Sequence, residues 1–322
     1  MTTLSTLPAA DAAIACSRSA SKAGVPGTDT VVGGISRRQF DRGSVISSFE
    51  PTAVVAVIPN YNMGESLQRL LPQVLNQGYD RVVVLDDAST DDSVEVVKDF
   101  GAAVEMVRSP VNQGAGANRN QIIDHVDDTT LIHFIDADMD LVTADIAEVA
   151  RKVYSQYANR GIGVIGGLVS RSDGSQEPFN FGPVFSLKTV MLSLPPALDR
   201  FRHKPKVVAA LRRIGVPGSK LWPDIFTSPE PRETYWLHEG NMLVHSAVFR
   251  AVGGYDPGVR YHETQDLAIR LEKLGVKRQF DPTIEVIHHY IDVRGKSRAP
   301  QERAAAVYLI RKHGIGHFLT GR

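Results

Sequence analysis

Short apolar runs and helix-like segments alternate along residues 52–158, and this alternation restricts the possible folds more than any other feature of the chain. Four runs are rich in aliphatic and β-branched residues and have the length of buried strands: residues 53–58, 81–85, 103–107 and 131–135. The segment after the first run places Leu67, Leu70 and Leu71 on one face of a helix. Strands that alternate with helices build parallel sheets. We therefore expect an α/β fold with a mostly parallel central sheet flanked by helices.

Three of these runs end in polar residues: Asn60-Tyr61-Asn62, Asp86-Asp87 and Asp136-Ala137-Asp138. In a doubly wound sheet such strand ends meet at one edge, which is where these folds bind ligands. The third end has aspartates at alternate positions, and such carboxylates suit Mg²⁺ or Mn²⁺ shared with phosphate oxygens. The alternative is an acidic surface turn in which Thr143 or Asp145 caps the next helix.

Later segments add titratable residues to the same predicted edge. The last predicted strand, residues 284–287, ends in His288 and His289, either of which can supply a nitrogen ligand to a cation. Glu263 and Asp266 lie at the start of a helix, where a carboxylate either acts as a base or only complements the helix dipole. Together these residues can support departure of a nucleoside diphosphate and deprotonation of an incoming hydroxyl.

The earlier strand ends offer groups that can contact such a nucleotide. Tyr61 can stack on a base, and Asp87 can accept hydrogen bonds from a base edge or from ribose hydroxyls. Arg119 or the backbone at Gly114 can approach a diphosphate. Each residue also has a structural interpretation, since Asp87 can cap a helix and Tyr61 can pack against the core.

Composition excludes several classes of protein. Lys plus Arg and Asp plus Glu both number 36, so no overall charge favours nucleic acid as a partner. The single cysteine, Cys16, excludes an intrachain disulfide framework and a cysteine-based zinc site. No apolar stretch approaches the roughly 20 residues of a spanning helix, and the first residues do not have the pattern of a signal peptide. We expect a cytoplasmic protein, with peripheral contact at the inner face of the membrane as the alternative.

A basic segment is the reason for considering peripheral contact with the membrane. It lies within residues 178–235, an irregular stretch that contains nine prolines. Between residues 200 and 213 a predicted helix carries Arg200, Arg202, Lys204, Lys206, Arg212 and Arg213. This segment is either an ordinary solvated helix over the core or a patch for a phosphate-bearing or lipid-linked substrate or the membrane surface.

A set of motifs joins these observations into one pattern. They are Val57-Ile58-Pro59-Asn60-Tyr61-Asn62, Val84-Leu85-Asp86-Asp87-Ala88-Ser89-Thr90-Asp91, Asn112-Gln113-Gly114 with Ala117-Asn118-Arg119-Asn120, Ile135-Asp136-Ala137-Asp138, Gly240-Asn241-Met242, Val252-Gly253-Gly254-Tyr255-Asp256 and Glu263-Thr264-Gln265-Asp266-Leu267. In this combination the chain resembles family 2 glycosyltransferases of the GT-A fold. The resemblance covers about three quarters of the chain, from Val54 to Tyr290.

The resemblance implies roles for individual positions. It implies that the nucleotide sugar is contacted by Pro59, Tyr61, Asp87, Gly114, Arg119 and Asp136. Asp136 and Asp138 would form the DxD pair, with Asp138 as the direct ligand of Mn²⁺ or Mg²⁺. A further metal ligand would come from His288 or His289.

One position departs from the family pattern. Where the family commonly has Glu-Asp-x-Asp-Leu around its catalytic base, this chain has Thr264 in place of the usual Asp. A threonine hydroxyl is too weak a base at neutral pH. We expect Glu263 to take this role, with Asp266 as the other candidate or a mechanism other than a simple inverting displacement. The Gln-x-x-Arg-Trp signature of processive members is absent, so we expect transfer of a single sugar.

The resemblance also divides the chain into parts. Residues 1–50 would be a flexible N-terminal extension. Residues 51–160 would be a Rossmann-like nucleotide-sugar-binding half, and residues 161–295 the acceptor-binding half of the same domain. Residues 296–322 would form a basic C-terminal tail with a helix.

The function that the resemblance implies is metal-dependent transfer of one sugar from a nucleotide-diphosphate sugar to an acceptor hydroxyl. The expected donor is a UDP-sugar, then a GDP- or dTDP-sugar, and the acceptor is a glycan, a lipid-linked molecule or a small molecule. The product would belong to glycan, glycolipid or natural-product glycoside biosynthesis. The alternatives are a catalytically impaired nucleotide-sugar-binding protein, which Thr264 favours, and a nucleotidyltransferase, which would need a basic glycine-rich loop after the first strand.

Two further classes fit less well. A phosphatase with an aspartate nucleophile would have such a motif on its first strand, whereas Asp136 follows the fourth predicted strand. A dinucleotide-dependent oxidoreductase would need a third glycine after Gly114-Ala115-Gly116 at the required spacing.

Overall fold

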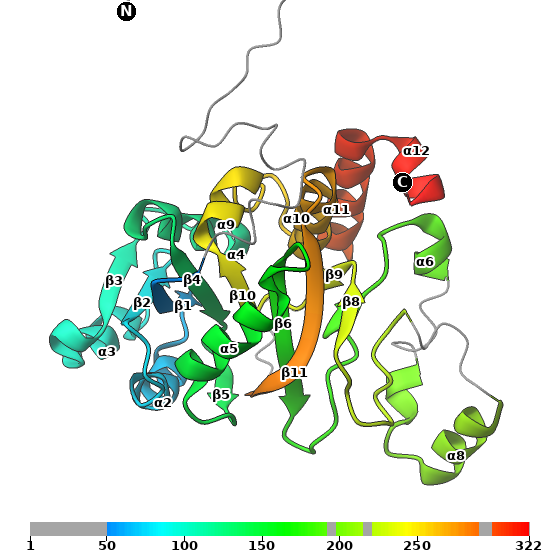
Figure 1. Ribbon diagram of the computed structural model, residues 1–322, viewed down its shortest axis with the longest axis horizontal. Helices are drawn as coiled ribbons and strands as arrows, with labels where there is room; N and C mark the ends of the chain where they lie inside the picture. The colour runs from blue at the N-terminus through cyan, green and yellow to red at the C-terminus, as the bar shows by residue number, and fades with distance from the viewer. Residues whose placement is uncertain (1–49, 192–197, 215–220, 290–297, 322) are drawn as a thin grey trace, which may run out of the picture.

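The computed structural model describes residues 50–191, 198–214, 221–289 and 298–321. The predicted N-terminal extension therefore lies outside the described residues, apart from Glu50. The described chain is built around a nine-stranded sheet with the strand order β3-β2-β1-β4-β10-β6-β11-β5, in which β8 pairs with the outer part of β11. Figure 1 shows helices on both sides of this sheet.

Six strands of the sheet run in the same direction, because β1, β2, β3 and β4 pair in parallel, β11 and β6 pair in parallel, and β10 runs antiparallel between β4 and β6. The predicted α/β fold with a mostly parallel sheet is thus confirmed. The strands are β1 Ala53–Asn60, β2 Arg81–Asp86, β3 Glu105–Arg108, β4 Thr130–Ile135, β5 Met139–Leu141, β6 Ile162–Arg171, β8 Arg232–Thr234, β10 Asn241–His245 and β11 Lys277–His288; a separate pair consists of β7 Phe181–Gly182 and β9 Trp236–Leu237.

The helices connect these strands and cover the sheet. They are α2 Gly64–Leu75, α3 Ser93–Asp99, α4 Ala115–Asn120, α5 Ile146–Ala158, α6 Leu187–Met191, α8 Pro205–Ile214, α9 Ser246–Val252, α10 Glu263–Lys273, α11 Arg298–His313 and α12 Ile315–Thr320, with short 3-10 turns η2 Gly101–Ala103, η3 Gln121–His125 and η4 Asp199–Phe201. The predicted boundary at residue 160 falls between α5 and β6. None of these helices is long and apolar enough to cross a membrane.

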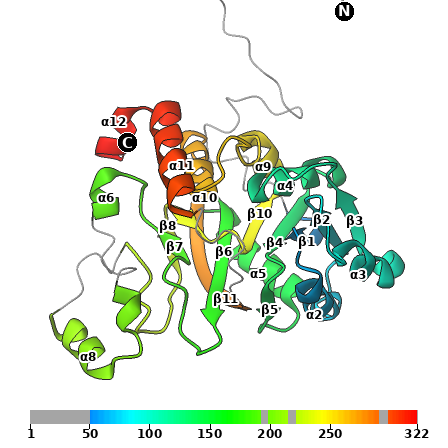
Figure 2. The same ribbon diagram turned by 180° about the vertical axis from the view of Figure 1, so that it is seen from behind.

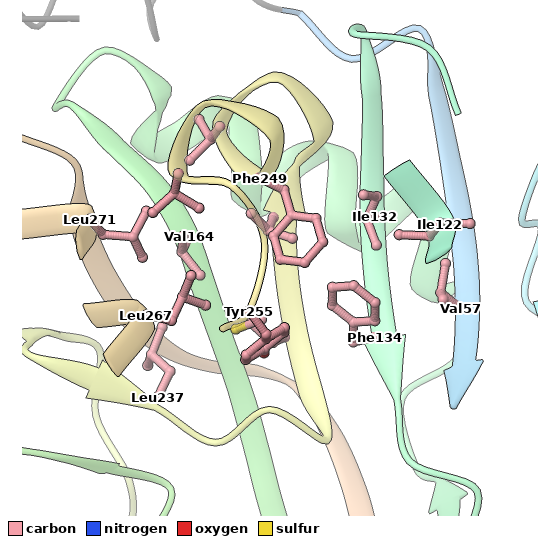
Figure 3. Close-up of a cluster of buried hydrophobic side chains, with 14 of the residues drawn as sticks. Val57, Ile122, Ile132, Phe134, Val164, Leu237, Phe249, Tyr255, Leu267 and Leu271 are labelled. Atoms are coloured by element: carbon pink, nitrogen blue, oxygen red, sulfur yellow. The ribbon is translucent and has the colours of Figure 1, made fainter. Parts of the chain in front are cut away.

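Alternation along the strands divides the core between the two faces of the sheet. Val55 and Val57 of β1 point to the face that α9 and α10 cover, where Phe134 of β4 meets Phe249 of α9 (Figure 3). Ile58 points to the opposite face, which α2 and α3 cover. Side chains of α5 form a third cluster on the same face of the sheet as α2 and α3. Both faces are therefore buried, which is why the central strands read as continuous apolar runs.

A buried polar relay crosses the middle of the sheet. The Tyr79 hydroxyl lies 2.7 Å from His133 Nδ1, and His133 Nε2 lies 2.8 Å from Asn241 Oδ1. Asn241 Nδ2 in turn donates to the carbonyl oxygens of Leu168 and Ile284. Burial lowers the pKa of His133 to about 4, so the imidazole is neutral at pH 7. The relay fixes β10 between β4 and β6 just below the acidic strand end.

Candidate active site

A cleft of about 570 Å³ opens where β1, β4 and β11 end. The cleft wall contains every site residue that the sequence predicts, with the exception of Asp266 and His289. The residues that it brings together are Pro59, Tyr61, Asp87, Gly114, Arg119, Asp136, Asp138, Glu263 and His288. Segments that are up to 229 positions apart, such as Pro59 and His288, thus meet at one sheet edge, as expected for the carboxyl ends of parallel strands.

The wall expected to hold the nucleoside is shaped by Asp87. Its two carboxylate oxygens accept hydrogen bonds of 2.8 Å from the backbone N–H groups of Gln113 and Gly114. Gly114 has φ 91°, a conformation that side chains other than glycine rarely adopt. Asp87 therefore holds the turn that leads into α4, while Tyr61 is 40% exposed at the opening of the cleft. An exposed ring in this position is able to stack on a base.

The first aspartate of the predicted DxD pair is held by a buried arginine. Arg119 Nη2 donates to Asp136 Oδ1, and Arg119 Nη1 lies 3.6 Å from Glu239 Oε1. The guanidinium lies over the rings of Phe134 and Tyr255, with 5.9 Å from Cζ to each centroid. Burial disfavours the charge of Arg119, but Glu239 and Asp136 raise its pKa above the ordinary value. Arg119 is thus a fixed cation that orients Asp136.

Gly240 makes room for Asp136 on the other side. A Cβ at Gly240 would lie 2.5 Å from Asp136 Oδ2 and 2.7 Å from Met139 Cε, which is closer than such atoms can approach. The backbone also joins the two segments, because Asp136 N donates to the Gly240 carbonyl oxygen over 3.2 Å. A residue with a side chain at position 240 would displace the Asp136 carboxylate.

The second aspartate of the pair faces a histidine from β11. His288 Nε2 lies 3.1 Å from Asp138 Oδ2, and His288 Nδ1 lies 3.7 Å from Glu177 Oε1. Burial alone would lower the pKa of His288, but the hydrogen bonds with Asp138 and Glu177 outweigh it and raise the pKa to about 10. The imidazole therefore lies between two carboxylates, one in the cleft wall and one behind it.

Strand alternation separates His288 from His289. His289 Nε2 lies 2.6 Å from Asp140 Oδ2, and Asp140 also accepts from Arg69 and Gln73. Successive side chains of a strand point to opposite faces, so only one of the two histidines at the end of β11 can face Asp138. His288 is that residue, and His289 contacts the cleft edge only through its backbone N–H, which donates to the Asp138 carbonyl oxygen.

The two carboxylates of the Glu263 to Leu267 motif lie in different surroundings. Glu263 lines the cleft and is 7% exposed, and its Cγ would lie 3.4 Å from a Cβ at Gly116. Thr264 is half-buried and is not among the cleft-lining residues. This arrangement keeps Glu263 as the acidic side chain of the motif that reaches the cleft.

Asp266, the other candidate base, lies outside the cleft and is fully buried. Its oxygens lie 2.7 Å from Arg270 Nε, Lys312 Nζ and His313 Nε2. Burial alone would raise the pKa of Asp266, but the charge of Arg270 and the hydrogen bonds from Lys312 and His313 lower it. The catalytic role of Asp266 stays a prediction that this position does not favour, because three donors surround the carboxylate. Two of them, Lys312 and His313, connect α11 to α10, and Figure 2 shows these two helices side by side.

Several cleft residues were not singled out from the sequence. Arg260 is exposed and lines the cleft beside Gly114, where its Cζ would lie 3.9 Å from a Cβ. Gln301 of α11 lines the opposite part. Glu239 was visible only as the neighbour of the Gly240-Asn241-Met242 motif. Glu177, which lies behind the cleft wall beside His288, directly precedes the irregular segment and gave no signal of its own.

Part of the chain matches a known protein family. Residues 55–177 match the family model described as glycosyl transferase family 2. Asp87, Arg119, Asp136 and Asp138 all fall inside the matched range.

Relatives and solved structures extend the comparison. The chain is 34% identical over 76 residues to glycosyltransferase AglJ of Haloferax volcanii, which is 24% of the length of each protein. GalNAc-T7, crystallised with UDP, GalNAc and Mn²⁺, has a TM-score of 0.53 and 18% identity over 80% of this chain and 47% of its own. Mannosyltransferase PcManGT from Pyrobaculum calidifontis was crystallised with GDP-Man and Mn²⁺. It has a TM-score of 0.51 and 14% identity, over 85% of this chain and 70% of its own. The chain thus has the predicted GT-A fold.

Proposed function

We propose that this family 2 chain is a metal-dependent glycosyltransferase that moves one sugar from a nucleotide-diphosphate sugar to an acceptor hydroxyl. The observation that carries the proposal is the meeting of Asp136, Asp138 and His288 in one cleft with the exposed ring of Tyr61. The two structures of similar fold contain UDP and GDP-Man, each with Mn²⁺. We propose a UDP-sugar as the donor and a GDP-sugar as the next candidate.

The donor nucleoside would lie along Pro59, Tyr61 and Asp87. The Tyr61 ring provides a stacking surface, and the Asp87 oxygens keep lone pairs beyond the two backbone hydrogen bonds that they accept. Arg260 is the exposed cation of the wall and would approach the diphosphate, whereas Arg119 is occupied by Asp136 and Glu239. The cleft therefore offers an aromatic ring, carboxylate acceptors and an exposed cation to the donor.

Asp138 and His288 would hold the cation. The Asp138 carboxylate oxygen and the His288 nitrogen lie 3.1 Å apart, and both suit Mn²⁺ and Mg²⁺ once the cation displaces the proton that His288 holds. Among the described residues no three His, Cys, Asp or Glu side chains form a complete metal site, so the remaining ligands would be diphosphate oxygens and water. When bound, the cation would neutralise charge on the departing diphosphate.

Glu263 would act as the base. Its carboxylate would take the proton of the acceptor hydroxyl while the acceptor oxygen forms a bond to the anomeric carbon. The bond from that carbon to the diphosphate oxygen breaks, and the nucleoside diphosphate leaves with the electron pair. A single displacement of this kind inverts the configuration at the anomeric carbon. Burial of Glu263 beside Tyr255 and Gly116 excludes water from one side of this group.

The test is a thermal-shift screen of UDP, GDP and dTDP, each with and without Mn²⁺, followed by turnover of the matching sugar donors. A ligand that binds only the folded state raises the melting temperature, and we expect the largest rise for one nucleotide together with Mn²⁺. Asp138→Ala should remove the Mn²⁺-dependent part of this rise and the turnover. Nucleotide binding without turnover of any donor would instead identify a nucleotide-sugar-binding protein.

A further inference from the structure

A basic helical arm extends from the core of the molecule. We define the basic arm as residues 199–214, which contain η4 and α8. Figures 1 and 2 both show α8 at a corner of the molecule, away from the central sheet. None of the arm side chains whose exposure is described is buried, in contrast to α2, α5, α9 and α10, each of which buries an apolar face. The arm is therefore not held by packing against the core.

The arm nevertheless has an apolar stripe. Val207, Leu211 and Ile214 follow one another at the spacing i, i+4, i+7 and share one side of α8. Ile214 is 76% exposed, and the other two are half-buried. Lys206 and Arg213, seven residues apart, border this stripe. Basic side chains beside an apolar stripe are typical of helices that lie in the plane of a lipid surface, where the alkyl stems are covered and the charges reach the headgroups.

The charge of the arm has one sign. Residues 199–214 contain six Lys or Arg and a single acidic residue, Asp199. Arg202 pairs with Asp173 and Asp199, and His203 lies 3.7 Å from Asp173. Lys204, Lys206 and Arg213 are exposed. Their charge is complementary to an anionic surface, and the exposed Ile214 distinguishes a bilayer from a purely charged polymer, which would leave that side chain in water.

Ion pairs connect the base of the arm to the catalytic cleft. Arg171 Nη1 lies 2.7 Å from Asp199 Oδ1, and Arg171 Nη2 lies 2.9 Å from Glu177 Oε2. Glu177 is the carboxylate behind His288. All three side chains are mostly buried, so the connection is shielded from solvent. A surface that binds the arm is thereby connected to the part of the cleft that His288 lines.

We propose that the basic arm docks the protein on an anionic phospholipid bilayer. The apolar stripe enters the headgroup region, and Lys204, Lys206 and Arg213 contact lipid phosphates. The proposal goes beyond sugar transfer and does not depend on it, because it concerns binding alone. Docking would present the cleft to acceptors that are anchored in the same bilayer.

Sedimentation with vesicles tests the proposal. The full chain should bind vesicles of equal parts phosphatidylcholine and phosphatidylglycerol, and should bind phosphatidylcholine vesicles at least tenfold more weakly. The variant Lys204→Gln/Lys206→Gln/Arg213→Gln should lose on the order of 100-fold in affinity for the anionic vesicles. Ile214→Ser should lose about tenfold, because it removes the exposed end of the apolar stripe.

A matched control removes the same charge elsewhere. Lys98→Gln/Lys152→Gln/Lys277→Gln changes three lysines that are 54% to 72% exposed, and it should keep the affinity of the parent chain. Unchanged melting temperature of each variant confirms that the fold is intact. The proposal is overturned if the parent chain does not bind anionic vesicles or if the arm and control variants lose affinity equally. It is also overturned if Ile214→Ser binds vesicles as the parent does while soluble heparin competes fully, which would identify a polyanion site.

Discussion

The buried relay through His133 makes the stability of the fold depend on pH. In an unfolded chain the imidazole has an ordinary pKa of 6.5, and in the folded chain burial lowers it to about 4. The folded state therefore resists protonation of His133. The stability that the neutral imidazole contributes is fully present above pH 6.5 and is lost as the pH falls toward 4. Protonation would also remove the acceptor that Nδ1 presents to the Tyr79 hydroxyl.

The size of the effect follows from the shift in pKa. One pKa unit corresponds to about 1.4 kcal/mol. Protonation of His133 alone should therefore lower the free energy of unfolding by roughly 3 kcal/mol once the pH is below both pKa values. When the pH falls from about 7.5 to about 5, the free energy of unfolding should fall by about 2 kcal/mol because of this residue. This is a large fraction of the stability of an ordinary domain.

Urea unfolding at these two pH values measures the loss directly. The parent chain is compared with His133→Gln, which keeps a polar side chain in the relay but does not titrate. All other groups, including the buried His245 with a pKa of about 4, contribute equally to both proteins and cancel. We expect the variant to be less stable at pH 7.5 and to lose about 2 kcal/mol less on acidification. His125→Gln, at an exposed histidine, is the control and should behave as the parent does. Equal losses in the parent and His133→Gln would refute the reasoning.

Three further predictions concern the cleft. Gly240→Ala should lower turnover at least tenfold with a small change in melting temperature, because the added Cβ displaces Asp136; kinetics and thermal unfolding of the same sample check this. Glu177→Gln should weaken Mn²⁺ binding on the order of tenfold, since it removes the carboxylate partner of the His288 ring; calorimetric titration with Mn²⁺ measures it, and an unchanged affinity would contradict the assignment. Glu263→Gln should reduce kcat on the order of 100-fold while nucleotide affinity is kept, and unchanged turnover would place the base elsewhere.

The class of sheet and most of the cleft could be predicted because the strands and the points where they end follow from local patterns. Apolar runs that stop at polar residues identify where parallel strands end, and that edge fixes the neighbours of Asp87, Asp136 and Asp138. The choice between His288 and His289 could not be made in this way. It depends on the register in which β11 pairs with β5, since a shift by one residue would exchange the faces to which the two side chains point.

The position of Asp266 outside the cleft has a different cause. Glu263 and Asp266 are three residues apart at the start of one helix, so local patterning makes them equivalent. What separates them is the docking of α11, which brings Lys312 and His313 to Asp266 from 46 and 47 positions further along the chain. Arg119 is similar, because its carboxylate partners Asp136 and Glu239 are set by tertiary packing. Long-range ion pairs of this kind leave no periodic signal in the sequence.

The anchoring of α11 also sets an order of events during synthesis. Gln301 contributes to the cleft wall, and α11 is fastened by Lys312 and His313, so one side of the cleft is built from residues that leave the ribosome after all of the sheet. Until those residues emerge, Asp266 has only Arg270 to balance a carboxylate that burial penalises. A nascent chain that ends before residue 312 would hold an assembled sheet beside an open cleft. The protein would thus acquire its nucleotide-binding wall early and complete the wall of the site only after α11 has been synthesised.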